Sequence, residues 1–262
     1  MNCPICNKST HFLTAKKDRF ARVYKYEICE NCRFIFEQNL VLDTIGLQKK
    51  VSDLYKSDYF DKIDVGWQGR CDGFLKIIKK IIRIYGFSKN KKDISVLDYG
   101  GGNGYLASKL YKDFNTFYYD KYEKPTFLGE YKILEQPKKA DIIYAVELVE
   151  HLTDIKEWEF LKELMPNVFV FTTGLSDNIN NKEIANWQYI NSDGGHTALY
   201  SSKSLYFLGK KYGFIYFFFP SISCHIFIKN KFLSKINFVF FEYSVYNVLR
   251  IIKKLLKNES IF

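Results

Sequence analysis

The sequence lacks any uninterrupted apolar stretch of the roughly 20 residues that a membrane-spanning helix requires. Its long apolar runs at residues 214–228 and 236–252 are broken by residues such as Pro220 and Glu242. The first ten residues, MNCPICNKST, also lack the apolar core of a signal peptide, and no internal repeat stands out. We therefore expect a cytoplasmic protein with one main domain, for which 262 residues and 47% hydrophobic content suffice.

Acidic residues are scarce only towards the C-terminus. Residues 201–262 contain ten Lys and Arg against two Asp and Glu, whereas residues 51–200 contain 20 against 22. A nucleic-acid-binding domain is more uniformly basic than this central segment, so we expect no nucleic-acid partner. The basic C-terminal flank remains able to attract phosphate or an anionic membrane.

Residues 229–262 are predicted to form a basic amphipathic extension. In YSVYNVLRIIKKLLK (residues 243–257), apolar residues recur at helical spacing and the basic residues lie on another face. Two interpretations stay open. We favour docking against the chain's own domain, and the alternative is peripheral contact with an anionic membrane.

The four N-terminal cysteines form two C-x2-C pairs, Cys3 with Cys6 and Cys29 with Cys32, separated by 22 residues. Each pair can turn two thiolates towards one metal ion, so the spacing predicts a tetrahedral zinc site in a ribbon at residues 1–40. The gap contains FARVYKYEI, whose alternation is typical of a strand. Four protein ligands complete the coordination sphere, so this zinc would be structural. Two disulfides or four buried thiols are the alternative.

Residues 41–72 are polar and mixed in character, which is typical of a linker or cap. From Gly73, apolar residues at helical spacing predict a helix, and from Ile94 strand and helix patterns alternate. Such alternation predicts an α/β fold over residues 73–228, with a mostly parallel sheet and helices on both of its faces.

The segment VLDYGGGNGYLA is the sharpest motif in the chain. A β-branched strand ends at Asp98, glycines follow at positions 100, 102 and 104, and a helix begins directly afterwards. Glycine permits a tight turn and a close approach of ligand to backbone. A dinucleotide site would show G-x-G-x-x-G, whereas this pattern is D-x-G-x-G-x-G. Asp120, at the tip of the next strand, is placed to accept hydrogen bonds from two ribose hydroxyls, so the pair of motifs fits an adenosyl nucleoside.

At residues 73–228 the sequence resembles the class I S-adenosylmethionine-dependent methyltransferases, which implies their Rossmann-like fold. The resemblance implies that Gly100, Gly102 and Gly104 border the methionine part of the cofactor, that Asp98 lies near its amino group and that Asp120 holds the ribose. Either aspartate is alternatively a turn former or helix cap. The predicted cofactor-binding set is completed by Tyr99, Gly101 and Glu147.

The segment ADIIYAVELVEHLTD is predicted to be a later strand of the same sheet with its exit loop. Glu147, Glu150 and His151 then emerge at the carboxyl end of the sheet, where open α/β folds bind ligands. This resembles the E-x-x-E-H run of a subgroup that includes quinone O-methyltransferases and sugar methyltransferases. Some of the latter carry an N-terminal four-cysteine zinc module.

Methylation of a hydroxyl requires an aligned acceptor and a group that removes its proton. We predict His151 as the general base, because imidazole is neutral at neutral pH, with Glu150 and His196 completing the catalytic set. His196 lies in DGGHTALYS, a polar loop segment that resembles one in the same subgroup. The alternative for either histidine is a hydrogen-bonded residue that only orders its loop.

Glu147, Glu150 and His151 would also share one face of a helix. Two carboxylates and one imidazole could then bind a divalent ion such as Mg²⁺, which is our minority interpretation.

Together these features predict a methyltransferase that uses S-adenosylmethionine and acts on a small-molecule or carrier-linked carbohydrate acceptor. We favour O-methylation of a sugar, nucleotide-sugar or phosphoryl-linked component of a bacterial surface glycan, such as capsule or lipopolysaccharide. The composition, low in Ala and high in Lys, Ile and Asn, is typical of an AT-rich bacterial genome. The alternatives are a zinc-ribbon RNA methyltransferase and a non-catalytic binding protein on the same fold.

Overall fold

The structure of the chain is a computed structural model that describes residues 1–54, 66–85, 90–129, 133–177, 179–219 and 223–232. Most of the predicted C-terminal extension, and residues 55–65 of the predicted linker, lie outside the described residues. Within the described residues, no helix has the length and apolar character needed to cross a membrane.

The main sheet has six strands in the order β5-β4-β6-β7-β10-β9. The first four strands are mutually parallel, and β10 runs antiparallel to both of its neighbours. The predicted fold class, with its mostly parallel sheet, is therefore confirmed. The bounds are β4 (Ser95–Tyr99), β5 (Asn115–Tyr119), β6 (Ile142–Ala145), β7 (Val168–Thr172), β9 (Ile215–Phe219) and β10 (Cys224–Ile228).

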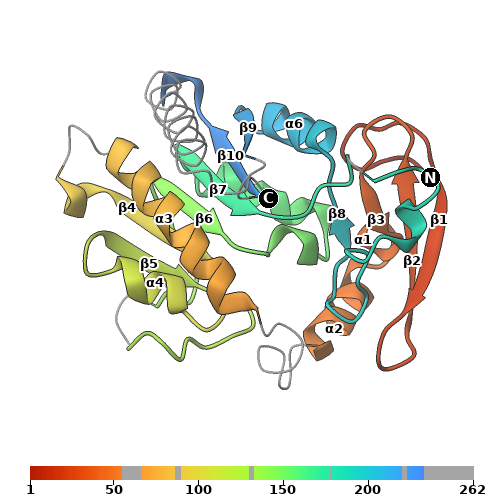
Figure 1. Ribbon diagram of the computed structural model, residues 1–262, viewed down its shortest axis with the longest axis horizontal. Helices are drawn as coiled ribbons and strands as arrows, with labels where there is room; N and C mark the ends of the chain where they lie inside the picture. Colours follow the sequence, from red (N-terminus) through yellow and green to blue (C-terminus); the bar gives the residue numbers. More distant parts are fainter. Residues whose placement is uncertain (55–65, 86–89, 130–132, 178, 220–222, 233–262) are drawn as a thin grey trace, which may run out of the picture.

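Helices cover both faces of this sheet. On one face, α3 (Trp67–Tyr85) and α4 (Tyr105–Leu110) pack a core of aliphatic residues against β4, β6 and β7. The helix predicted from Gly73 thus begins six residues earlier, at Trp67. On the other face lie α6 (Ser202–Lys211) and the short helices η4 (Ile155–Glu159) and α5 (Phe160–Glu163). Figure 1 shows α3 lying across the sheet.

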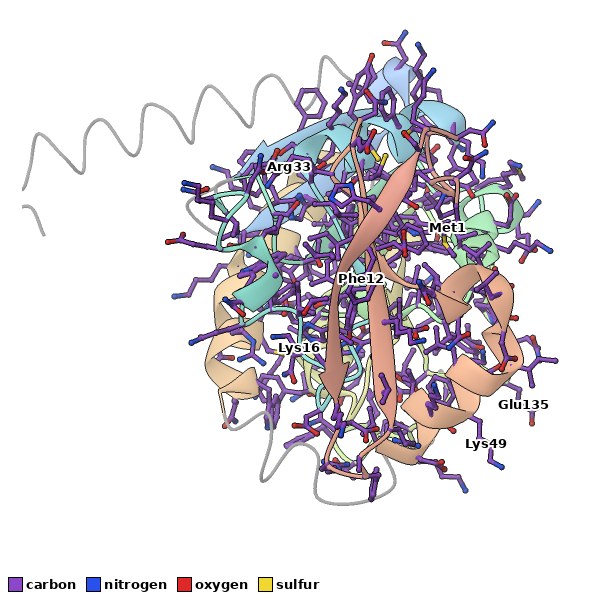
Figure 2. All side chains as sticks on the ribbon, turned by 90° about the vertical axis from the view of Figure 1, so that its right-hand side faces the viewer. Met1, Phe12, Lys16, Arg33, Lys49 and Glu135 are labelled. Carbon is purple, nitrogen blue, oxygen red and sulfur yellow. The ribbon has the colours of Figure 1, made fainter. Side chains whose placement is uncertain are left out.

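The N-terminal residues form a second, antiparallel sheet. Its first three strands are β1 (Thr10–Lys17), β2 (Val23–Cys29) and β3 (Ile35–Glu37), so the predicted hairpin is formed by β1 and β2. The fourth strand is β8 (Ala198–Leu199), which comes from the far end of the chain. Figure 1 shows this sheet beside the main one, and Figure 2 looks onto its outer side, where Phe12 and Lys16 of β1 face the viewer.

The segment predicted as a linker contains two helices, α1 (Asn39–Leu42) and α2 (Thr44–Leu54), before the residues that are not described. Buried Leu40, Leu47 and Val51 of these helices join the same core as the N-terminal sheet and the neighbouring face of the main sheet. We call residues 1–54 the N-terminal module. Because it shares a strand and a core with the rest of the chain, the module is packed into the fold.

Four further 3-10 turns complete the described chain: η2 (Lys91–Asp93), η3 (Val149–His151), η5 (Ile184–Asn186) and η7 (Asn230–Phe232). The segment 154–165, whose pattern predicts one helix, instead forms η4 followed by the single turn of α5. Trp158 of η4 is fully buried, and its indole nitrogen donates to the Tyr200 hydroxyl at 3.1 Å. The segment that buries Trp158 thus has the tighter 3-10 geometry instead of that of a continuous α-helix.

Strand order places the ligand site. From β4 the chain crosses through α4 to β5 on one side, whereas β6 lies on the other side of β4. The order thus reverses between β4 and β6, and open α/β sheets bind ligands at the carboxyl ends of strands at such a point.

Candidate functional site

A cavity lies at the carboxyl ends of β4, β5 and β6. Of the eight residues predicted to bind the cofactor, seven line it: Asp98, Tyr99, Gly100, Gly101, Gly102, Asp120 and Glu147. His151 lines it as well. Gly104, Glu150 and His196 are absent from the lining; Glu150 is fully buried and His196 nearly so.

The glycine loop is shaped by the protein's own packing. Gly100 and Gly104 have φ values of +72° and +80°, a region that favours glycine. A Cβ at Gly100 would lie 2.5 Å from the Leu148 side chain, and one at Gly104 would lie 2.7 Å from Pro125. The Tyr118 hydroxyl donates to the Gly102 carbonyl at 2.6 Å and holds the loop from below. The loop therefore presents backbone rather than side chain to the cavity.

Asp120 ties two loops of the cavity together. Its Oδ2 accepts the Gly102 N–H at 2.9 Å, and its Oδ1 accepts the N–H groups of Tyr122 and Glu123, each at 2.8 Å. The turn-forming contacts that the sequence left as an alternative are thus present. Its role towards a ribose stays a prediction.

Asp98 lies beneath the glycine loop and is 1% exposed. Its Oδ2 accepts the Ala107 N–H at 3.2 Å, at the start of α4. Burial raises the pKa of this carboxyl to about 7. A cationic amino group beside it would compensate the buried charge, and this fits the amino end of S-adenosylmethionine.

The run of residues 147–151 turns sharply out of β6. Glu147 has a φ of +48°, which is rare for a side chain other than glycine, and its N–H donates to Thr172 Oγ1 at 2.9 Å. The turn η3 follows, closed by the His151 N–H donating to the Leu148 carbonyl at 2.9 Å. Glu147 therefore lies outside the helical turn and does not share a face with Glu150 and His151 in the way that helical spacing implies.

Glu150 points away from the solvent and contacts Tyr189. The Tyr189 hydroxyl donates to Glu150 Oε1 at 2.5 Å, and the other carboxyl oxygen, Oε2, is buried near Thr173. Burial, followed by the nearby Glu147 charge, raises the pKa of Glu150 well above its ordinary value.

The two predicted catalytic histidines lie together. Their rings are edge to face with centroids 4.8 Å apart. Nδ1 of His196 lies 2.8 Å from the Tyr189 carbonyl, and Nδ1 of His151 lies 3.3 Å from the Gly195 carbonyl. A carbonyl can only accept, so both Nδ1 atoms carry the hydrogen and each neutral ring presents a lone pair at Nε2. Burial lowers the pKa of His196 to about 4 and that of His151 well below its ordinary value.

Two clusters among the described residues have the composition of metal sites. The first cluster consists of Glu150, His151 and His196. Each residue contributes one donor atom, and these three atoms lie within 4.8 Å of one another. Glu147, which the sequence suggested, is replaced by His196. Two imidazoles and one carboxylate suit a transition metal better than Mg²⁺, which prefers oxygen ligands. A divalent-ion site that includes Glu150 and His151 stays a prediction, with Mg²⁺ the less suited ion.

The second cluster is formed by the four predicted cysteines. The Sγ atoms of Cys3 and Cys32 are 3.6 Å apart and those of Cys6 and Cys29 are 3.4 Å apart, too far for disulfides. Thiolates around one zinc ion lie about 3.8 Å apart. In each pair the residue after the second cysteine, Asn7 or Arg33, has a positive φ and donates its N–H to the carbonyl of the first cysteine. The cluster can therefore hold a zinc ion.

Several residues that line the cavity were not predicted from the sequence. Trp67 and Arg70 of α3 and Val51 of α2 line it, although all three belong to the segment predicted as a linker. The contacts of Tyr189 with Glu150 and His196 were not predicted either. Nothing in NWQYINS separates this tyrosine from an ordinary loop residue, because its partners Glu150 and His196 meet it only through the fold.

The mixed sheet, the glycine loop at its switch point and the cavity there define a Rossmann-like methyltransferase that uses S-adenosylmethionine. The sequence model of the family described as "Methyltransferase domain" matches residues 72–216. This match spans more than half of the chain, and the chain therefore belongs to that family.

No curated protein matches the chain. Among solved structures, Streptomyces venezuelae DesVI is 13% identical, with a TM-score of 0.47, 67% of this chain covered and 100% of that one. Magnesium protoporphyrin IX methyltransferase from Synechocystis PCC 6803, solved with bound SAH, is 12% identical, with a TM-score of 0.41 and coverages of 65% and 95%. A SAM-dependent methyltransferase from Archaeoglobus fulgidus is 20% identical, with a TM-score of 0.39 and coverages of 53% and 69%.

We expect Asp120→Asn to weaken binding of S-adenosylhomocysteine about tenfold or more. The amide has one acceptor oxygen where the carboxylate has two, and it lacks the negative charge that strengthens the hydrogen bonds that Asp120 accepts. Isothermal titration measures the affinity. Asp113→Asn is the matched control, since the Asp113 side chain is 52% exposed and pairs only with Lys79 among the ion pairs of the described residues. Equal affinities in the two variants would contradict the role of Asp120 in the cavity.

We expect nitrogen NMR of the histidines to show two tautomers. The chain has four histidines, which makes selective ¹⁵N labelling practical. His151 and His196 should carry hydrogen on Nδ1, whereas His225 should carry it on Nε2, which lies 3.0 Å from the Thr173 carbonyl. Since burial lowers all three pKa values, none should titrate near the ordinary value of 6.5, and His196 and His225 should titrate only near pH 4. A ring of His151 or His196 that protonates near pH 6.5 would refute this arrangement.

Proposed function

We propose that the protein transfers a methyl group from S-adenosylmethionine to a hydroxyl of a sugar, nucleotide-sugar or phosphoryl-linked component of a bacterial surface glycan. The observation that carries the proposal is the position of the His151 imidazole in the wall of the cavity that the glycine loop borders. S-adenosylmethionine supplies an electrophilic methyl group, so the chain must align the acceptor and take its proton.

His151 suits the second task. Its Nδ1 faces the Gly195 carbonyl, which orients the ring, and in the proposed reaction Nε2 accepts the hydroxyl proton. Glu150 and His196 do not line the cavity, so we assign them to orienting and surrounding His151 rather than to contact with the acceptor. Burial keeps the imidazole neutral at neutral pH, so the base needs no activation.

The lining of the cavity carries both signs of charge. Arg70 and Lys121 contribute basic side chains, whereas Asp98, Asp120, Glu123, Glu147 and Glu157 contribute acidic ones. The proposed acceptor class therefore rests on the resemblance of the E-x-x-E-H run and not on the charge of the lining.

We also propose that the four-cysteine cluster holds a structural zinc ion. The distances between sulfur atoms and the matching turns at Asn7 and Arg33 support it. Four thiolates fill the coordination sphere, so the ion would take no part in methyl transfer.

The proposal is tested with S-adenosylmethionine carrying a radioactive methyl group. We expect label to enter nucleotide-sugars or phosphoryl-linked sugars as a stable methyl ether. Bulk RNA, offered in parallel at low and high salt, should take up none. Labelled RNA with a steep salt dependence would favour the RNA methyltransferase alternative instead.

We expect His151→Gln to lower kcat by about 10²- to 10⁴-fold, the range for loss of a general base, with S-adenosylhomocysteine affinity unchanged. His11→Gln is the control, because His11 lies on the exposed outer strand β1. The base is inactive when protonated, and its lowered pKa means that wild-type activity should hold from pH 8 to 6 and fall only at pH well below 6.5. Unchanged turnover in His151→Gln would remove the assignment.

A further inference from the structure

Residues 189–197, which we call the His196 loop, are fixed on one side by the N-terminal module. The Tyr26 hydroxyl of β2 donates to the His196 carbonyl at 2.8 Å, and the Glu37 N–H of β3 donates to the Thr197 carbonyl at 2.8 Å. Ser192 Oγ donates to the Lys17 carbonyl at 2.9 Å. The module therefore contacts the loop near its middle and at its end.

On its other side the loop is fixed to the run of residues 147–151. The Thr197 N–H donates to the Glu150 carbonyl at 2.8 Å, and Tyr189 accepts from His196 while donating to Glu150. The Gly195 carbonyl accepts from His151 Nδ1. The loop is thus a single layer between the module and the predicted base.

Helix α2 of the module packs against the His196 loop at Gly195. A Cβ at Gly195 would lie 3.2 Å from Leu54 and 3.5 Å from Val51, and the φ of Gly195 is +75°. Val51 also lines the cavity. The module therefore reaches the cavity directly through α2 and indirectly through the loop.

We propose that the N-terminal module is the acceptor-side wall of the active site, and that Tyr26 is a positioning residue that sets the His196 backbone and, through Gly195, the orientation of His151. The cofactor side depends on different residues, those that follow β4 and β5. The module then controls where the acceptor and base lie without altering cofactor binding. This inference rests on the proposed function only in naming that side as the acceptor's.

Tyr26 has a matched control two residues away. Tyr24 lies on the same face of β2 and is likewise buried, but among the described residues its hydroxyl, which lies near Asp18, makes no hydrogen bond to the His196 loop. Replacing either residue by Phe keeps the ring and removes one oxygen. Only Tyr26→Phe removes a donor from the His196 loop.

The test is amide hydrogen exchange with the full-length protein and S-adenosylhomocysteine as the only ligand. In Tyr26→Phe, we expect exchange in residues 189–199 to rise about fivefold or more, the ratio that follows from loss of one buried hydrogen bond. Exchange in residues 98–104 and S-adenosylhomocysteine affinity should stay as in wild type. The His196 ¹⁵N resonances should shift in this variant and not in Tyr24→Phe. If Tyr26→Phe does not fold, Ser192→Ala tests a second contact between the loop and the module, the bond from Ser192 Oγ to the Lys17 carbonyl.

Exchange in residues 189–199 that is identical in Tyr26→Phe, Ser192→Ala and wild type would overturn the inference. So would faster exchange that extends to residues 98–104 with weakened S-adenosylhomocysteine binding, because that result indicates general destabilisation. Neither readout uses an acceptor. A failure of the proposed acceptor class in the radiolabel assay is therefore distinguishable from a failure here.

Discussion

The pairing of β3 with β8 is the constraint on which the candidate site depends. Two residues, Ala198 and Leu199, join the antiparallel sheet of the N-terminal module directly after the His196 loop. Their burial makes one continuous core from the module to the main sheet. The strand pairing anchors the end of the loop, and the Thr197 N–H donates to the Glu150 carbonyl. His196 and Gly195 therefore have little conformational freedom, and the Gly195 carbonyl in turn orients the ring of His151.

Burial then determines the charge of the site. Glu150, His151 and His196 each lose solvation, so burial favours the neutral acid, by raising the pKa of Glu150, and the neutral imidazoles, by lowering the pKa values of both histidines. A charged carboxylate beside the histidines would favour imidazolium and remove the base. The Tyr189 bond to Glu150 Oε1 opposes that protonation only partly, since burial is the larger cause. Neutrality of the cluster is thus a product of packing.

Local patterns predicted which residues meet at the carboxyl ends of β4 and β5, and their role towards the cofactor stays a prediction. Asp98, the glycines and Asp120 follow strand ends, and strand ends can be recognised from alternation, β-branched residues and glycine, so seven of eight predicted residues line the cavity. The cysteine spacing likewise predicted the cluster, because each pair closes within one turn. The other side could not be predicted in this way. Tyr189, Tyr26, Val51 and β8 meet through contacts between distant segments, and the helical spacing of Glu147 with His151 failed because Glu147 turns out of β6 with a positive φ.

We infer that the residues packed against the run of residues 147–151 influence which acceptor fits the cavity. The run of residues 147–151 presents His151 to the cavity, but the chain segments that face His151 belong to the His196 loop and to α2. The same run packed against a different module would offer the same base to a differently shaped space. On the proposed function, the run removes the proton of the acceptor, and we propose that the choice of acceptor depends on what is packed against the run. In this chain the N-terminal module, which contains the cysteine cluster, is packed there. Under this proposal a cluster that takes no part in methyl transfer would still support the wall that selects the acceptor.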